Sequence, residues 1–211
     1  MERRTIEVPR TARYYVRAEP GAVAREVWFL LHGYGQLAAP FLESAGGLAR
    51  PGRTLVAPEG LSRYYLRRGT GTVGASWMTR EERADEIRDT LRYLDRVWGE
   101  VRAAEPRARP TALGFSQGGA AAARWAVLGQ APVEHLVSWG CPLPTDLELE
   151  AHAERVRALR WTFVLGRLDE SIDRAAHAAG LARLRALGVE PAEHEFPGGH
   201  ELEPGLLGAL A

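Results

Sequence analysis

Apolar and polar positions along this chain fall into two alternating patterns. Short, nearly continuous apolar runs are typical of strands that are buried on both faces of a sheet. Longer stretches in which apolar residues return every three or four positions are typical of amphipathic helices. The first pattern predicts strands at residues 13–17, 26–31, 53–57, 111–115, 135–139, 161–165 and 192–196.

The second pattern fills the intervals between these strands. Thr79 is followed by Glu82 at the spacing of a capping box, so we expect a helix of about twenty residues to begin at Thr79. Residues 59–76 show neither pattern and are expected to be a long irregular loop. Further helices are expected at residues 120–128, at 173–187 with Gly188 as the C-terminal cap, and at 202–210.

Regular alternation of strands and helices predicts an α/β fold, in which a mostly parallel sheet is covered by helices on both faces. The chain has 211 residues, the length of one domain, and residues 1–211 show no repeat or linker that would divide it. Ligands of such sheets bind at the carboxyl ends of the strands. The turns that follow the strands are therefore the place to search for chemistry.

Composition narrows the possible partners. The formal net charge is +0, so no overall field attracts nucleic acid, and we expect no nucleic-acid partner. No apolar run reaches the ~20 residues of a membrane span, and the first residues lack the apolar core of a signal peptide, so a cytoplasmic protein is expected. The one cysteine, Cys141, excludes an intrachain disulfide and is expected to be buried. These features leave the oligomeric state open.

The strongest chemical signal is the run Gly-Phe-Ser-Gln-Gly-Gly at residues 114–119, between a predicted strand and a predicted helix. A serine on a glycine-flanked turn from strand to helix is typical of a nucleophile elbow. We expect Ser116 to have a strained backbone and a hydroxyl that faces a cleft. Gly114 and Gly118 are expected there because a Cβ at either position would collide with the neighbouring element.

A serine hydroxyl needs an adjacent base, usually a histidine that a carboxylate orients. In an elbow hydrolase the acid and then the histidine follow the serine along the chain. His200 comes after the last predicted strand and is the expected base, and Asp169 comes after strand 161–165 and is the expected acid. The alternatives are His135, His152, His177 and His194 for the base, with His152 and His177 expected to be solvated on helices, and Glu170, Asp173 and Asp146 for the acid.

Two hydrogen-bond donors are needed for the oxyanion of the tetrahedral intermediate. The first is the N–H of Gln117, directly after the nucleophile. The second is expected from residues 32–36, after strand 26–31, where two glycines let the backbone turn sharply. We assign it to the Tyr34 N–H, with Gly33 as the alternative. His32 is expected to brace this loop by hydrogen bonding.

These motifs occur together in the order and spacing of one known family. Over about residues 25–211 the chain resembles the phospholipase/carboxylesterase branch of the α/β-hydrolases, which includes the acyl-protein thioesterases. The resemblance implies the α/β-hydrolase fold, the same triad and the same oxyanion donors, and it suggests that Trp77 and Met78 border the acyl pocket. The motifs that carry it are Leu31-His32-Gly33-Tyr34-Gly35, Ala57-Pro58-Glu59, Ser76-Trp77, the run 114–119, Gly166-Arg167-Leu168-Asp169 and Gly199-His200-Glu201.

Two places depart from the usual residues of the family, and both bear on the substrate. Residues 77–79 read Trp-Met-Thr, and residues 170–172, after the acid, read Glu-Ser-Ile. Trp77 is either a pocket wall or a core residue. Residues 63–68 mix arginine with tyrosine, which favours a solvated loop with packed tyrosines over a rim that holds an acidic substrate group.

The expected function is hydrolysis of a carboxylic ester, a small molecule or an acyl chain, through an acyl-enzyme. An acyl-protein or acyl-CoA thioesterase is the first alternative, and a non-catalytic ligand-binding homologue is the second. The segment between Cys141 and Trp161 is too short for a large lid domain. No metal-ligand spacing is present, and neither a metal nor a cofactor is expected.

Overall fold

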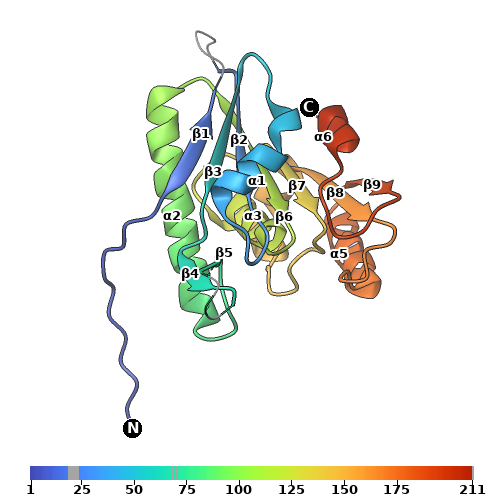
Figure 1. Ribbon diagram of the computed structural model, residues 1–211. Helices are drawn as coiled ribbons and strands as arrows, with labels where there is room; N and C mark the ends of the chain where they lie inside the picture. The colour runs from blue at the N-terminus through green and yellow to red at the C-terminus, as the bar shows by residue number, and fades with distance from the viewer. Residues whose placement is uncertain (19–23, 68, 70, 211) are drawn as a thin grey trace.

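The computed structural model describes residues 1–18, 24–67, 69 and 71–210. Its centre is a seven-stranded sheet in the order β1-β3-β2-β6-β7-β8-β9 (Figure 1). Neighbouring strands run parallel, except that β1 lies antiparallel to β3 at one edge. The expected mostly parallel sheet is therefore confirmed. Its strands are β1 (Tyr14–Arg17), β2 (Glu26–Leu31), β3 (Arg53–Pro58), β6 (Arg109–Phe115), β7 (His135–Trp139), β8 (Arg160–Gly166) and β9 (Ala192–Phe196).

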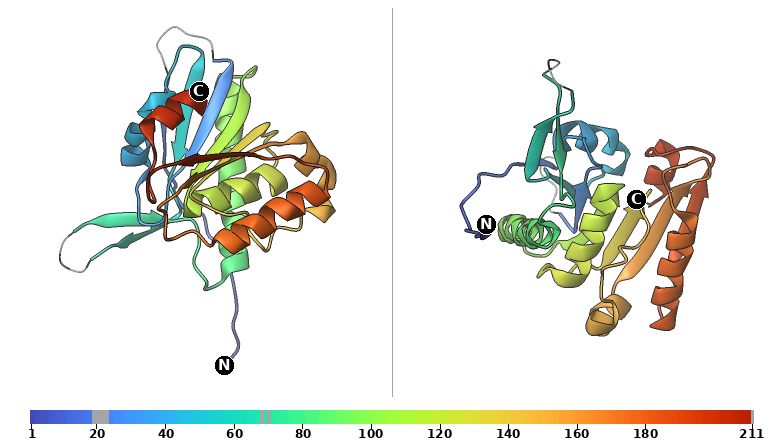
Figure 2. Two further views of the ribbon diagram at one scale, coloured as in Figure 1. Left: turned by 90° about the vertical axis from the view of Figure 1, so that its right-hand side faces the viewer. Right: turned by 90° about the horizontal axis from the view of Figure 1, so that it is seen from below.

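Helices cover both faces of the sheet (Figure 2). On one face α2, α3, α4 and α5 pack on a core that includes Phe29 and Trp125. On the other face α1 and α6 pack on a second core that includes Leu30 and Phe41. Phe29 and Leu30 are neighbours in β2 and face opposite layers because strand side chains alternate. The helices are α1 (Ala38–Ser44), α2 (Arg83–Ala104), α3 (Gln117–Leu128), α4 (Ala153–Ala158), α5 (Arg174–Ala186) and α6 (Pro204–Leu210), with 3-10 turns at Gly46–Leu48 and Glu150–His152.

The expectation of an irregular loop at residues 59–76 is wrong. This segment contains an antiparallel hairpin, β4 (Ser62–Tyr65) and β5 (Val73–Ser76), which projects from the body of the sheet (Figure 2). Positions in β4 alternate between half-buried and exposed, but a strand of four residues is too short to reveal that period in the sequence. Its partner strand contains mostly small residues and adds little signal. Arg68, in the predicted loop, lies outside the described residues.

The expected capping box at Thr79 is also wrong. Helix α2 begins at Arg83, and Glu82 before it has a positive φ of 47°, which a helical residue cannot have. The Glu86 carboxylate, one turn into the helix, accepts hydrogen bonds from the Thr79 N–H and hydroxyl instead. Thr79 therefore lies before the helix and is hydrogen-bonded to Glu86 within it, but it is not the N-cap residue.

The predicted end of the next long helix is correct. Gly188 follows the C-terminal cap residue of α5 and has a φ of 78°, the left-handed conformation that glycine adopts without strain. The Asp173 carboxylate caps the other end of α5 and lies 2.9 Å from the Ala176 N–H. Within the described ranges, no helix combines the length and apolar character needed to cross a bilayer.

Candidate active site

Ser116 lies on the sharp turn between β6 and α3. Its φ of 54° and ψ of −123° lie in a region that non-glycine residues rarely occupy, so the turn is strained, as the elbow motif requires. A Cβ at Gly114 would lie 2.1 Å from the Gly118 carbonyl oxygen, and a Cβ at Gly118 would lie 2.1 Å from the Leu31 carbonyl oxygen. The predicted reason for both glycines is therefore confirmed.

His200 and Asp169, which come from different turns, form a close pair. His200 Nδ1 lies 2.6 Å from Asp169 Oδ2. The Asp169 side chain is 1% exposed and the His200 side chain is 32% exposed, so the acid is enclosed and the base is open to a ligand. Because Nδ1 faces the carboxylate, Nε2 is the nitrogen left for proton transfer.

The carboxylate of Asp169 is held in its charged form. Burial alone would raise the pKa of the Asp169 carboxyl, but hydrogen bonds from Ser171 and His200 outweigh it and hold the pKa below its usual range. A charged carboxylate can both fix the tautomer of His200 and stabilise its protonated form.

Contacts with the residue before Ser116 and with the turn after β7 place the His200 ring next to the elbow. The ring of Phe115, the residue before the serine, lies 4.8 Å from the His200 ring between centroids. The Ser116 N–H donates to the Trp139 carbonyl at the end of β7, with 2.8 Å between nitrogen and oxygen. A Cβ on the next residue, Gly140, would lie 3.1 Å from His200 Cε1. The turns after β6, β7, β8 and β9 thus meet at the carboxyl ends of these strands.

The structure separates the other acid candidates from this pair. Asp146 binds two arginines, with Oδ1 2.7 Å from Arg124 Nη2 and Oδ2 2.9 Å from Arg83 Nη1. Asp173 caps α5, and Glu170 is exposed to solvent. Each of these carboxylates has a role or an environment of its own away from His200.

The other histidines lie elsewhere in the fold. His194 is exposed on β9, and His152 is half-buried in the 3-10 turn before α4. The expected surface position of His177 is wrong: its side chain is 7% exposed and its ring packs on Phe163. The pattern of α5 hid this because alanines surround His177 on the helix. His135 lies at the amino end of β7.

The two expected oxyanion donors have free backbone amides. Among the described residues, neither the Tyr34 N–H nor the Gln117 N–H has a hydrogen-bond acceptor. The Gly33 N–H, the alternative, donates to Gln36 Oε1 with 2.7 Å between the atoms. The amides of Tyr34 and Gln117 are therefore the ones available to an oxyanion.

His32 braces the loop that carries Tyr34. Its Nε2 accepts a hydrogen bond from the Gly60 N–H at 3.0 Å, so Nδ1 carries the proton and donates to the Gly33 carbonyl at 2.8 Å. Burial lowers the pKa of His32, which keeps the ring neutral. The indole of Trp77 packs on this ring, with 5.0 Å between centroids, and donates from Nε1 to the His32 carbonyl at 2.7 Å.

Trp77 and Met78 lie behind the elbow. Trp77 is 2% exposed and belongs to the core, which is one of the two positions considered for it. The Gln117 side chain, which sequence reasoning missed, ties this segment to the elbow: Oε1 accepts from the Trp77 N–H at 3.0 Å, and Nε2 donates to the Met78 carbonyl at 2.7 Å. Gln117 thus contributes both its amide and a side chain that fixes the neighbouring segment.

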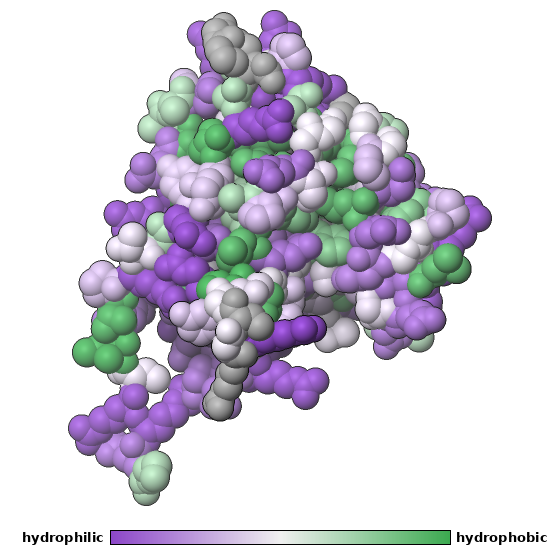
Figure 3. Space-filling model, viewed as in Figure 1, coloured by the Kyte–Doolittle hydropathy of each residue, from purple (hydrophilic) through white to green (hydrophobic). Residues whose placement is uncertain are grey.

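The hairpin partly covers the Tyr34 loop. The rings of Tyr34 and Tyr64 lie 5.4 Å apart between centroids, whereas Tyr65 is 70% exposed. The packing expected for the tyrosines of residues 63–68 therefore holds for Tyr64 and fails for Tyr65. In the view of Figure 3, apolar residues reach the surface in several separate groups.

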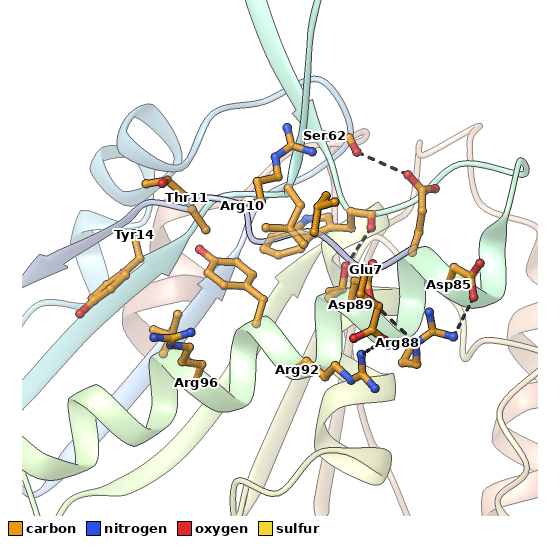
Figure 4. A pocket seen from close by; sticks show the side chains of 18 of the residues that line it. Glu7, Arg10, Thr11, Tyr14, Ser62, Asp85, Arg88, Asp89, Arg92 and Arg96 are labelled. Atoms are coloured by element: carbon orange, nitrogen blue, oxygen red, sulfur yellow. Dashed lines mark hydrogen bonds and ion pairs between the residues drawn. The ribbon is translucent and has the colours of Figure 1, made fainter. Parts of the chain in front are cut away.

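A hollow of about 1230 Å³ lies between the N-terminal segment and α2, and Trp77 is among the residues that line it (Figure 4). Charged side chains line much of it, including Glu7 and Arg10 from the segment and Arg88 and Arg92 from the helix. Glu7 and Arg92 form an ion pair across it, with 2.6 Å between Oε1 and Nη1. No member of the Ser116, Asp169 and His200 group borders this hollow, so its size does not make it the reaction site.

Comparison with solved structures supports the class of protein that this sheet and elbow define, the α/β-hydrolases. Acyl-protein thioesterase 2 of Zea mays has a TM-score of 0.75 at 18% identity, over 95% of this chain and 96% of that one. A carboxylesterase of Mesorhizobium loti has a TM-score of 0.72 at 20% identity, over 94% and 93%. The Bacillus cereus carboxylesterase has a TM-score of 0.70 at 16% identity, over 94% and 91%. At these identities the likeness establishes the fold.

Sequence comparison then gives the family. Residues 14–210 match the family model described as Phospholipase/Carboxylesterase. No curated protein sequence matches the chain. Because the family model spans nearly the whole chain, the protein belongs to the phospholipase/carboxylesterase family of α/β-hydrolases.

Proposed function

We propose that this protein is a serine hydrolase that cleaves carboxylic esters through a triad of Ser116, His200 and Asp169. The observation that carries the proposal is the pair of His200 Nδ1 and Asp169 Oδ2, 2.6 Å apart, whose imidazole ring packs on Phe115, the residue before the serine of a strained strand-to-helix turn. Family membership supports it, and so do the esterases and the thioesterase among the similar structures.

In the first half of the reaction, Ser116 Oγ attacks the ester carbonyl carbon and its proton passes to His200 Nε2. Asp169 holds the ring so that Nε2 faces the serine, and stabilises the imidazolium that forms. The carbonyl oxygen becomes negative and is bound by the N–H groups of Tyr34 and Gln117. The intermediate then collapses, and the alkoxide leaves with the proton from His200.

In the second half, water replaces the alcohol. It loses a proton to His200 Nε2 as it attacks the acyl-enzyme, and the same oxyanion donors bind the second intermediate. Collapse releases the carboxylic acid and returns the proton to Ser116. All groups in this scheme are side chains and amides of the chain itself, so it needs no cofactor.

The substrate side of the proposal rests on Trp77 and Met78. Trp77 is buried, so it shapes the pocket through the Tyr34 loop, which its indole supports. Met78 is half-buried and is the member of the two that can contact an acyl chain. A thioester would pass through the same steps with a thiolate as the leaving group, which keeps an acyl-protein or acyl-CoA thioesterase as the second candidate.

Hydrolysis of nitrophenyl esters of increasing acyl length, measured beside acyl-CoAs, tests the proposal. Ser116→Ala should lower kcat/KM about a thousandfold or more, because only binding and oxyanion stabilisation remain. Ser44→Ala is a matched control, since the hydroxyl that it removes donates to the Phe41 carbonyl in α1 and has no other partner among the described residues. Near-normal turnover by Ser116→Ala would refute the site. Absence of turnover of every ester and thioester by the wild type would favour a non-catalytic homologue.

A further inference from the structure

Ser171 is a third residue in contact with the pair of Asp169 and His200, and it lies two residues after the acid. Its Oγ lies 2.5 Å from Asp169 Oδ1 and 2.9 Å from His200 Nδ1. Its backbone N–H also donates to Asp169 Oδ1, with 3.0 Å between the atoms. The side chain therefore touches both the acid and the base.

The donors and acceptors that each group has available fix the direction of these hydrogen bonds. A serine hydroxyl donates one hydrogen, and a carboxylate only accepts, so Ser171 donates to Asp169 Oδ1. Its oxygen lone pairs remain free to face the N–H at His200 Nδ1, which donates mainly to Asp169 Oδ2 at 2.6 Å. The two carboxylate oxygens thus accept from different residues: Oδ1 accepts from Ser171 and Oδ2 accepts from His200.

We propose that Ser171 is a positioning residue of the triad, which acts by fixing the Asp169 carboxylate so that Oδ2 stays against His200 Nδ1. This inference rests on the proposed function, because it assumes that Asp169 and His200 work with Ser116. Two hydrogen bonds from one residue to Oδ1 prevent rotation of the carboxylate, so Oδ2 stays aligned with Nδ1. They also favour the charged form of Asp169.

The surroundings leave this role to Ser171. The His200 ring is packed by Phe115 and Gly140, which carry no charge. Arg174, at the start of α5, is bound to the Gly166 carbonyl and to Glu195. The remaining carboxylates nearby are Asp173, which caps α5, Glu170, which is exposed, and Glu201, which lies 3.3 Å from the Gly199 N–H.

Ser171→Ala removes the hydroxyl and keeps the backbone bond to Asp169. We expect kcat/KM for a nitrophenyl ester to fall about tenfold, almost wholly in kcat, because the hydroxyl acts on the base and not on substrate binding. Ser171→Thr keeps the hydroxyl and adds one methyl group at a residue that is exposed, and it should restore activity to within about twofold of wild type. Ser44→Ala, the control hydroxyl deletion, should have wild-type kcat and KM.

The same alanine change in an Asp169→Asn background separates positioning from general damage. Without the carboxylate the hydroxyl has nothing charged to fix, so Ser171→Ala should then change kcat/KM by less than about twofold. A further tenfold loss in that background, or wild-type activity of Ser171→Ala alone, would overturn the inference, and so would a folded Ser171→Thr that restores nothing. If Ser116→Ala and Asp169→Asn each lose about a thousandfold in kcat/KM while Ser171→Ala is fully active, the proposed function stands and only the role of Ser171 fails.

Discussion

A histidine with a close charged partner lies at the amino end of the parallel strands, and another lies at their carboxyl end; the two partners carry opposite charges. At the amino end, His135 Nδ1 lies 2.7 Å from Arg160 Nη2. At the carboxyl end, His200 Nδ1 lies 2.6 Å from Asp169 Oδ2. Arginine can only donate, so His135 must accept at Nδ1 and stay neutral, whereas Asp169 only accepts and favours a protonated Nδ1 on His200.

Burial widens the difference. His135 is 5% exposed, and burial together with the charge of Arg160 lowers its pKa to about 4. Its Nε2 lies 2.9 Å from Thr162 Oγ1, so both ring nitrogens are bound within the fold. The His200 side chain, by contrast, is partly exposed to solvent. A histidine with both ring nitrogens hydrogen-bonded within the fold, such as His135, stabilises the protein, whereas the partly exposed His200 suits the proton transfer that we propose for it.

The largest expected effect comes from deleting each ring. His200→Ala should lower kcat/KM for an ester about a thousandfold or more and change the free energy of unfolding by less than about 1 kcal/mol. His135→Ala should do the reverse: it leaves Arg160 and Thr162 without a partner, costs about 1–3 kcal/mol of stability, and leaves kcat/KM within about threefold. Kinetics and urea unfolding of both variants test this. Loss of activity without loss of stability in the His135 variant would contradict the purely structural role of His135.

Replacing the partner of His200 should come next. Asp169→Asn keeps the shape of the side chain but removes the charge that fixes the tautomer, and should lower kcat/KM about a thousandfold. Glu170→Gln and Asp173→Asn are matched amide controls from the same turn and should stay within about threefold of wild type. A larger loss in either control than in Asp169→Asn would move the acid to that residue.

The pH dependence of activity gives a smaller, graded effect. Attack by Ser116 needs the neutral imidazole. On the acid limb of the pH profile, kcat/KM should therefore fall about tenfold for each pH unit. The pKa of Asp169 lies below its usual range, so this carboxylate stays charged throughout that limb. His194→Ala should keep the limb, because His194 is exposed on β9. A flat profile with chemistry rate-limiting would exclude a histidine base, and a limb lost only in the His194 variant would reassign it.

The last expected effect is on the stability of the protein and not on its activity, and it comes from His135 at the amino end of β7. His135 binds a proton more readily in the unfolded chain than in the folded protein, where its pKa is about 4. Stability from the neutral ring is therefore complete above the unfolded pKa of about 6.5 and is lost as pH falls towards the folded value. Wild type should lose about 2–3 kcal/mol more than His135→Gln between pH 7.5 and 4.5. Equal losses in urea unfolding would contradict the neutral, buried histidine.

The strands and the elbow could be predicted because each leaves a contiguous pattern. Every strand of the main sheet is either a run of apolar residues or an alternation of apolar and polar ones. Ser116 stands between Gly114 and Gly118, where the close approach of the backbone leaves no space for a Cβ. The places of Asp169 and His200 followed from the rule that chemistry gathers where parallel strands end. The structure brings these two together, which their spacing along the chain could not show.

Single polar residues account for most of what the sequence left hidden. Ser171, the Gln117 side chain and the Trp77 indole each act through one to three side-chain hydrogen bonds. Such contacts leave no periodicity, because the partner is distant in sequence or the residue type is common in turns. The short hairpin of β4 and β5 escaped for a related reason, since its pairing depends on backbone atoms that every residue has.

The most direct test of the account is covalent labelling by a fluorophosphonate, which reacts with a serine only when a base activates it. Peptide mapping by mass spectrometry should find one label, on Ser116, and no label in Ser116→Ala. Labelling of His200→Ala should be slower by about a thousandfold, and that of His135→Ala should be unchanged. A wild-type protein that takes no label, or that carries it on a residue other than Ser116, would contradict the proposed active site.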